Sequence, residues 1–109
     1  MATPINTFQT VATTLTTAST AIYTTPANTT AIVLLAQCAN ITGSTVNVTA
    51  LHFDGVSSNI ELIKNFSVPA NDAVSLLTGK LVLEAGQSFY ANAAANSSLK
   101  LVMSIIESI

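Results

Sequence analysis

Charge is what this sequence lacks most. Three lysines, no arginine and five acidic residues make up 7% of its 109 residues, against about 25% in ordinary soluble domains. With a net charge of −2 and no basic cluster, the chain has little to neutralise a phosphate backbone, which argues against a nucleic-acid partner. A lone soluble chain keeps itself dispersed with charge, so this neutrality predicts that other chains cover much of the surface.

Cysteine, tryptophan and long apolar runs are also scarce. The single cysteine, Cys38, cannot form an intramolecular disulfide and is predicted to be a small buried side chain. The longest apolar run, AIVLLA at 31–36, is far shorter than the ~20 residues that cross a bilayer, and MATPINTFQT lacks the features of a signal peptide. We therefore expect no membrane partner and a chain made, unprocessed, in the cytoplasm.

Alternation with a period of two residues predicts β-strands along most of the chain. In TVNVTALHF (45–53), Val46, Val48 and Ala50 share one side of the strand, and SLKLVMSII (98–106) alternates in the same way. The alanine-rich stretch YANAAANSS is predicted to be a loop, because asparagines interrupt it and no apolar face has helical spacing. Further strands are predicted at 21–24, 31–39, 60–68, 73–77, 81–83 and 88–91.

Turn residues separate these strands and define the fold class. The tripeptide PAN occurs at Pro26–Asn28 and again at Pro69–Asn71, each time before an apolar strand, which predicts two matching corners. Short strands without crossover helices predict an all-β, antiparallel, jelly-roll-like sandwich of about eight or nine strands. The predicted core is Ile32, Leu34, Val46, Val48, Leu62, Val74, Leu76, Leu81, Leu83, Phe89, Leu101, Met103 and Ile105.

The sandwich domain is predicted to span residues 21–109, and residues 1–20 are different in composition. This segment is rich in threonine and has no charge and no glycine. It is predicted to be either an extended arm that orders on a neighbouring subunit or the first strand. Its apolar residues Ile5, Phe8, Val11 and Leu15 are the predicted assembly contacts.

The stretch TGKLVLEAGQSF (78–89) carries two further predicted contacts. Leu81 and Leu83 share one face of a short strand, so Lys80 and Glu84 lie on the other. Four residues along a strand span about 13 Å, which is too far for one ion pair. We expect these charges to be exposed beside the strand, where they hinder wrong edge pairing.

No set of residues indicates catalysis. His52 and Asp54 share one face of a strand, but no nucleophile or oxyanion hole is tied to them, although Ser57 and Ser58 are near. A half-buried strand histidine is the interpretation that we adopt. The acidic residues, His52 and Cys38 show no metal-ligand spacing, so the sequence predicts no enzyme, no cofactor and no metal.

Three segments carry a family resemblance: PANTTAIVLLAQCANITGSTVNVTALHF, then GKLVLEAG, then a final alternating strand that ends in SIIES. Over residues 21–107 the chain resembles small β-sandwich virion proteins of tailed bacteriophages, especially phages of marine bacteria and cyanobacteria. Gln87 departs from that pattern, since a charged residue commonly follows EAG.

The resemblance implies a non-enzymatic protein of the virion that decorates or cements the capsid, or that sits at the neck or tail. Implied partners are copies of the chain itself, with a trimer favoured, and virion proteins such as the major capsid protein. The alternative from the residues is a carbohydrate- or receptor-binding module. The absence of tryptophan counts against it, because sugar sites usually stack a ring on an exposed aromatic side chain.

Overall fold

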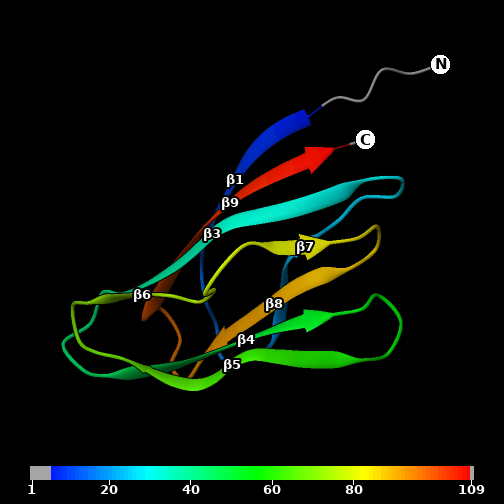
Figure 1. Cartoon of the computed structure of the whole chain (residues 1–109). Coiled ribbons are helices and arrows are strands. Elements are labelled where there is room, and N and C mark those ends of the chain that lie inside the picture. Colours follow the sequence, from blue (N-terminus) through cyan, green and yellow to red (C-terminus); the bar gives the residue numbers. More distant parts are fainter. Residues whose placement is uncertain (1–5, 109) are drawn as a thin grey trace.

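The computed structural model describes residues 6–108, and every regular element in that range is a β-strand (Figure 1). No helix in this range is long and apolar enough to cross a membrane. The strands are β1 (Asn6–Thr14), β2 (Thr20–Thr24), β3 (Thr30–Asn40), β4 (Val46–Phe53), β5 (Asn59–Val68), β6 (Ala73–Ser75), β7 (Leu81–Leu83), β8 (Ser88–Ala93) and β9 (Leu99–Ser108).

The strands form two antiparallel sheets that pack face to face. One sheet has the order β1-β9-β3-β6, with β7 also beside β3, and the other has the order β2-β8-β4-β5. The chain passes repeatedly between the sheets, and the first and last strands lie side by side (Figure 1). The predicted all-β, antiparallel sandwich of about eight or nine strands is confirmed.

All eight predicted strands are present, as β2 to β9. The prediction of a loop over YANAAANSS is wrong in its first part, because β8 continues to Ala93. Ala91 and Ala93 are buried between the two sheets. Their small side chains allow the sheets to approach closely.

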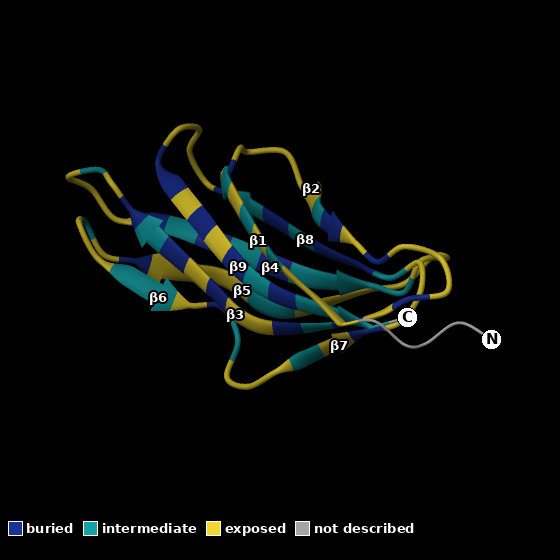
Figure 2. Cartoon of the chain, turned by 90° about the horizontal axis from the view of Figure 1, so that it is seen from above, coloured by how far each residue is buried: buried dark blue, intermediate teal, exposed yellow. Residues whose placement is uncertain are grey.

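The core lies between the sheets and contains most of the predicted residues, with Phe89, Leu83 and Met103 among its largest side chains. Buried residues alternate with more exposed ones along β9 (Figure 2). The prediction that Ile32 and Leu34 of β3 belong to the core is wrong. Ile32 lies on the outer face of the sheet, and Leu34 lies at the bulge with its side chain partly exposed. A register shift between Val33 and Leu35 in the pairing with β9 interrupts the alternation of β3. The inward positions are therefore Ala31 and Val33 before the shift and Ala36 and Cys38 after it, with Leu34 37% exposed.

The segment predicted as an arm or a first strand forms a strand in the structure. β1 pairs with β9 along its whole length, from Asn6 opposite Ser108 to Thr14 opposite Lys100. Directly after β1, the Leu15 side chain enters the core and its backbone N–H donates to the Leu99 carbonyl at 2.8 Å. Residues 1–5, which include Ile5, lie outside the described residues.

The two PAN corners have the same backbone conformation. Asn28 and Asn71 have φ angles of 57° and 56°, in the left-handed region that asparagine tolerates better than most residues. One corner leads into β3 and the other into β6, which are neighbours in the same sheet. The prediction of two matching corners is confirmed.

Candidate assembly surface

An apolar row crosses the outer face of the β1-β9-β3-β7 sheet. In the strand registers, Phe8 lies opposite Ile106, Ile106 opposite Ile32, and Ile32 opposite Val82. These positions alternate with the inward ones, so all four side chains point away from the core. Phe8 is 75% exposed and Val82 is 53% exposed, so both ends of the row are open to solvent.

The same face continues with short polar and apolar side chains. Leu35 lies opposite Ser104, and Val102 lies between Ala12 and Gln37 in the strand registers. Leu35 and Val102 are each about 40% exposed. We call Phe8, Ile32, Leu35, Val82, Val102 and Ile106 the apolar face.

The apolar face contains no charged side chain, but several lie at its margins. Lys100 follows at the far end of the sheet, opposite Thr14 and Ala39, while Lys80 and Glu84 flank β7. A contiguous apolar surface with polar neighbours is typical of a protein contact.

The outer face of the second sheet is more polar, and its polar groups bind one another. The Ser67 hydroxyl lies 3.0 Å from the Asn47 side-chain oxygen, and the Asn65 backbone N–H donates to the Thr49 hydroxyl at 3.0 Å. Phe53 and Tyr90 pack edge to face there, with ring centroids 5.7 Å apart. The two faces of the sandwich therefore differ in kind, and the apolar face is the better candidate for a contact.

The predicted contacts are distributed unevenly around this surface. Phe8 belongs to the apolar face, and Lys80 and Glu84 are exposed beside it. Val11 faces inward and packs against the core, and Leu15 is 1% exposed. Leu15 is therefore not available as a contact while β1 keeps its place in the sheet.

Sequence reasoning missed five members of the apolar face: Ile32, Leu35, Val82, Val102 and Ile106. The signal was present in β9, because Leu99–Ser108 has apolar residues at both inward and outward positions. A strand with one solvated face alternates apolar and polar residues, so apolar residues on both sides indicate that both faces are to be covered.

Glu107 links three strands at one end of the sandwich. Its carboxylate accepts a hydrogen bond from the Gln9 side-chain amide at 2.8 Å and another from the Tyr23 hydroxyl. Tyr23 is buried, and this burial, together with the hydrogen bond to Glu107, raises the pKa of Tyr23 well above its usual value. The network joins β2 of one sheet to β1 and β9 of the other.

Stability should therefore fall at high pH. The stability that neutral Tyr23 contributes is complete below about pH 10 and is lost as the pH rises through its raised folded-state pKa. We expect the free energy of unfolding, measured with urea from pH 8 to pH 11, to decline above about pH 10. Tyr23→Phe should reduce this decline and the control Tyr90→Phe should keep it; equal declines in both variants would contradict the assignment.

His52 and Asp54 do not form an oriented catalytic pair. The His52 Nε2 atom lies 3.2 Å from the Gln87 side-chain oxygen. Asp54 instead accepts backbone N–H groups from Val56, Ser57 and Ser58 at 2.8, 2.9 and 3.1 Å, and these bonds lower its pKa. Asp54 therefore organises its own turn, and the prediction of a half-buried strand histidine is confirmed.

Cys38 is fully buried on β3, as predicted, and burial raises the pKa of its thiol to about 11. Among residues 6–108, no group of three or more His, Cys, Asp or Glu side chains is placed to hold a metal ion. A thiol with a raised pKa is a poor nucleophile, so its contribution is to packing.

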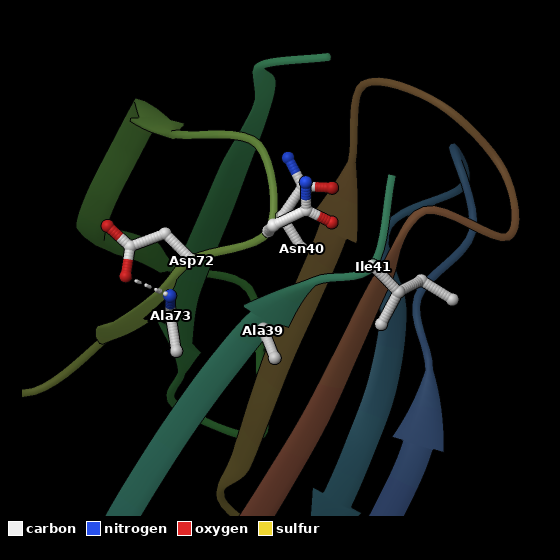
Figure 3. Close-up of a pocket in the computed structure, with 6 residues that line it drawn as sticks. Ala39, Asn40, Ile41, Asp72 and Ala73 are labelled. Carbon is white, nitrogen blue, oxygen red and sulfur yellow. Dashed lines mark hydrogen bonds between the residues drawn. The ribbon is translucent and has the colours of Figure 1, made fainter. Parts of the chain in front are cut away.

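A shallow hollow lies at the other end of the sandwich, lined by Ala39, Asn40, Ile41, Asn71, Asp72 and Ala73 (Figure 3). The Asn40 amide donates to the carbonyls of Ser44 and Val68, at 2.8 and 3.0 Å, while its oxygen accepts the backbone N–H and the hydroxyl of Thr42. One Asp72 carboxylate oxygen accepts the Ala73 N–H at 2.8 Å. The hollow is therefore a hydrogen-bonded corner of the fold. The amide donors and the acceptor oxygen of the Asn40 side chain are all in use within the corner.

Comparison with known proteins gives a likeness of fold. No protein family and no curated protein matches the sequence. A chain from the disulfide-linked pili of Bacillus endospore appendages is similar over 97% of this chain and 87% of its own, with a TM-score of 0.58 and 11% identity. A chain from the capsid of a Helicobacter pylori bacteriophage is similar over 98% of this chain and 92% of its own, with a TM-score of 0.57 and 10% identity.

A third similar structure is the VP2 subviral particle of infectious bursal disease virus. It matches 97% of this chain with a TM-score of 0.53 and 9% identity, and the match covers 33% of the longer VP2 chain. The chain therefore has the β-sandwich fold that occurs in capsid and pilus proteins.

Proposed function

We propose that this chain is a non-enzymatic structural protein of a bacteriophage particle that decorates or cements the capsid. It binds the shell, through proteins such as the major capsid protein, and it binds copies of itself. The observation that carries the proposal is the apolar face, which a solitary chain with 7% charged residues would expose to water.

The fold likeness supports the same proposal. The phage capsid chain is matched over 92% of its length, so the two proteins agree in size as well as in fold. A decorating protein needs only modest affinity per copy, because copies that contact one another on the shell bind with avidity. We propose a homo-oligomer, with a trimer as the favoured state, located in the virion on the head rather than at the neck or tail.

A pilus-like appendage subunit is the second candidate, favoured by the likeness to the Bacillus pilus chain. Those pili are described as disulfide-linked. The one cysteine of this chain, Cys38, is fully buried, so it offers no exposed thiol for links between subunits. Electron microscopy of the purified chain, alone and mixed with phage heads that lack it, distinguishes the candidates. Filaments of the chain alone would favour an appendage, and chains bound to heads would favour decoration.

The test of the proposed function is binding to phage particles that lack the chain. The double variant Phe8→Ser, Val82→Ser removes both exposed ends of the apolar row. Burial of each such side chain contributes about 1.5–3 kcal/mol, so affinity for the particles should fall by about 100-fold or more. Binding should change little between low and high salt, because few charges take part.

The matched control is Ile41→Ser, Val56→Ser, which alters two exposed apolar residues outside the apolar face. This control should bind like the unmodified chain. Equal losses in both double variants, or binding that collapses at high salt, would contradict the proposed role of the apolar face.

A further inference from the structure

We propose that the open edge of β1 pairs, antiparallel and about a two-fold axis at Thr10, with β1 of a second copy of this chain. β1 is a terminal strand of its sheet, with β9 on one side and no strand on the other among the described residues (Figure 1). A strand in this position presents a row of unpaired N–H and C=O groups, which is a template for another strand.

The backbone pattern identifies the groups on this edge. The Leu15 N–H donates to the Leu99 carbonyl, so that pair is hydrogen-bonded across the ladder. Hydrogen-bonded and non-bonded pairs alternate along an antiparallel ladder, and the β1–β9 register has no irregularity. The backbone groups of Phe8, Thr10 and Ala12 therefore face the open edge.

The other sheet edges carry features that hinder pairing. β5 is long but contains Glu61 and Lys64, register shifts against β4, and Asn65 with a φ of 49°. β2 is five residues long with a register shift, and β6 and β7 are three residues each. Charges, bulges and short length are the means by which proteins protect edges. β1, with nine residues, no charge and no proline, has none of them.

The composition of β1 suits a second β1 as its partner. Full overlap of two antiparallel copies pairs Thr10 with Thr10 and Phe8 with Ala12, so a large side chain meets a small one. Phe8 then lies beside Ala12 of the second copy, whose Val102 is the next residue across the sheet. The apolar row of one copy thus runs on into the second copy, and no like charges meet.

The role of this pairing in the virion rests on the proposed function. The pairing itself can be tested with the purified chain alone. A two-fold contact at the edge of β1 leaves the apolar face, apart from Phe8, free for the shell or for a trimer. It buries Phe8 partly, which accounts for the most exposed aromatic ring in the described residues.

The first test is disulfide crosslinking of Thr10→Cys. Opposed residues in a hydrogen-bonded pair have Cα atoms about 5.5 Å apart, which a disulfide can span. Since Cys38 is buried, only the new thiol is accessible. Mild oxidation should give a two-chain species at least about ten times faster than the control Ser67→Cys on the edge strand β5. Equal rates, or no crosslinked Thr10→Cys, would overturn the pairing.

The second test uses charge at the two-fold axis and reads mass by analytical ultracentrifugation. Thr10→Lys and Thr10→Glu should each lose self-association at the β1 edge, and an equimolar mixture of the two should recover it as a heterodimer. Thr10→Pro should also lose it while folding normally, because the Thr10 N–H does not serve the β1–β9 ladder. Thr10→Lys that associates like the unmodified chain, or a mixture that stays monomeric, would overturn the inference.

Failure of this inference is distinguishable from failure of the proposed function. A chain that binds particles but does not crosslink at Thr10→Cys overturns the strand pairing and leaves the virion role in place. A chain that crosslinks at Thr10→Cys but ignores particles overturns the virion role and leaves the pairing.

Discussion

Asn40→Ala should lower the free energy of unfolding by about 3 kcal/mol, because it removes four hydrogen bonds of a buried side chain, one of them to the buried Val68 carbonyl. Asn40 is 3% exposed, and its amide donates to the Ser44 and Val68 carbonyls while its oxygen holds Thr42. Each hydrogen bond contributes about 0.5–1.5 kcal/mol net, and a buried polar group that loses its partner costs about 1–3 kcal/mol. Urea unfolding at neutral pH measures the effect.

Asn47→Ala is the matched control, because among the described residues the Asn47 side chain accepts one hydrogen bond, from the exposed Ser67 hydroxyl. Its expected cost is below about 0.5 kcal/mol. Asn40→Asp should cost at least as much as Asn40→Ala, because it keeps the acceptor for Thr42 but places a carboxylate oxygen against the Ser44 and Val68 carbonyls. If Asn40→Ala and Asn47→Ala have equal free energies of unfolding, the stability of the corner does not depend on the Asn40 amide.

The strands and turns of this fold were predictable because their signals are local. Alternation and turn residues gave all eight strands from β2 to β9, and the repeated PAN gave two corners of equal backbone conformation. The bulge in β3 was not predictable, since a run such as AIVLLA is apolar at every position. Such a run does not show which of its residues point toward the core. Ile32 and Leu34 were therefore assigned to the wrong side.

The candidate surface was less predictable, because it depends on which strands become neighbours. Phe8 and Val82 are far apart in the sequence, and only the registers of β1, β9, β3 and β7 bring them into one row. The role of Asn40 was hidden for the same reason. Its partner Val68 belongs to β5, and an asparagine before a turn gives no sign of burial.

The positions of the few charges form a pattern that composition alone does not show. Glu61 and Lys64 lie on the edge strand β5, and Lys80 and Glu84 flank the short edge strand β7. Four of the eight charged residues are thus placed where they hinder strand pairing, and none lies on β1. The scarcity of charge is therefore selective, and this selectivity favours assembly through β1 and the apolar face.

We also propose that β1 is an integral part of the folding unit, and removal of residues 2–15 tests this with the largest expected effect. Deleting a buried leucine side chain costs about 2–5 kcal/mol, and the truncation also removes Val11 from the core and Gln9 from Glu107. Since domains are stable by about 5–15 kcal/mol, the truncated chain should unfold at least about 10 °C lower or fail to fold.

Circular dichroism during heating measures this effect, with removal of residues 2–5 alone as the control that leaves β1 whole. The control should unfold within a few degrees of the unmodified chain, because the β1–β9 ladder and Leu15 remain in place. The opposite result is equally clear. If the chain without residues 2–15 unfolds at the original temperature and loses only its attachment to particles, then residues 1–20 act as a separate arm and the sandwich proper begins at residue 21.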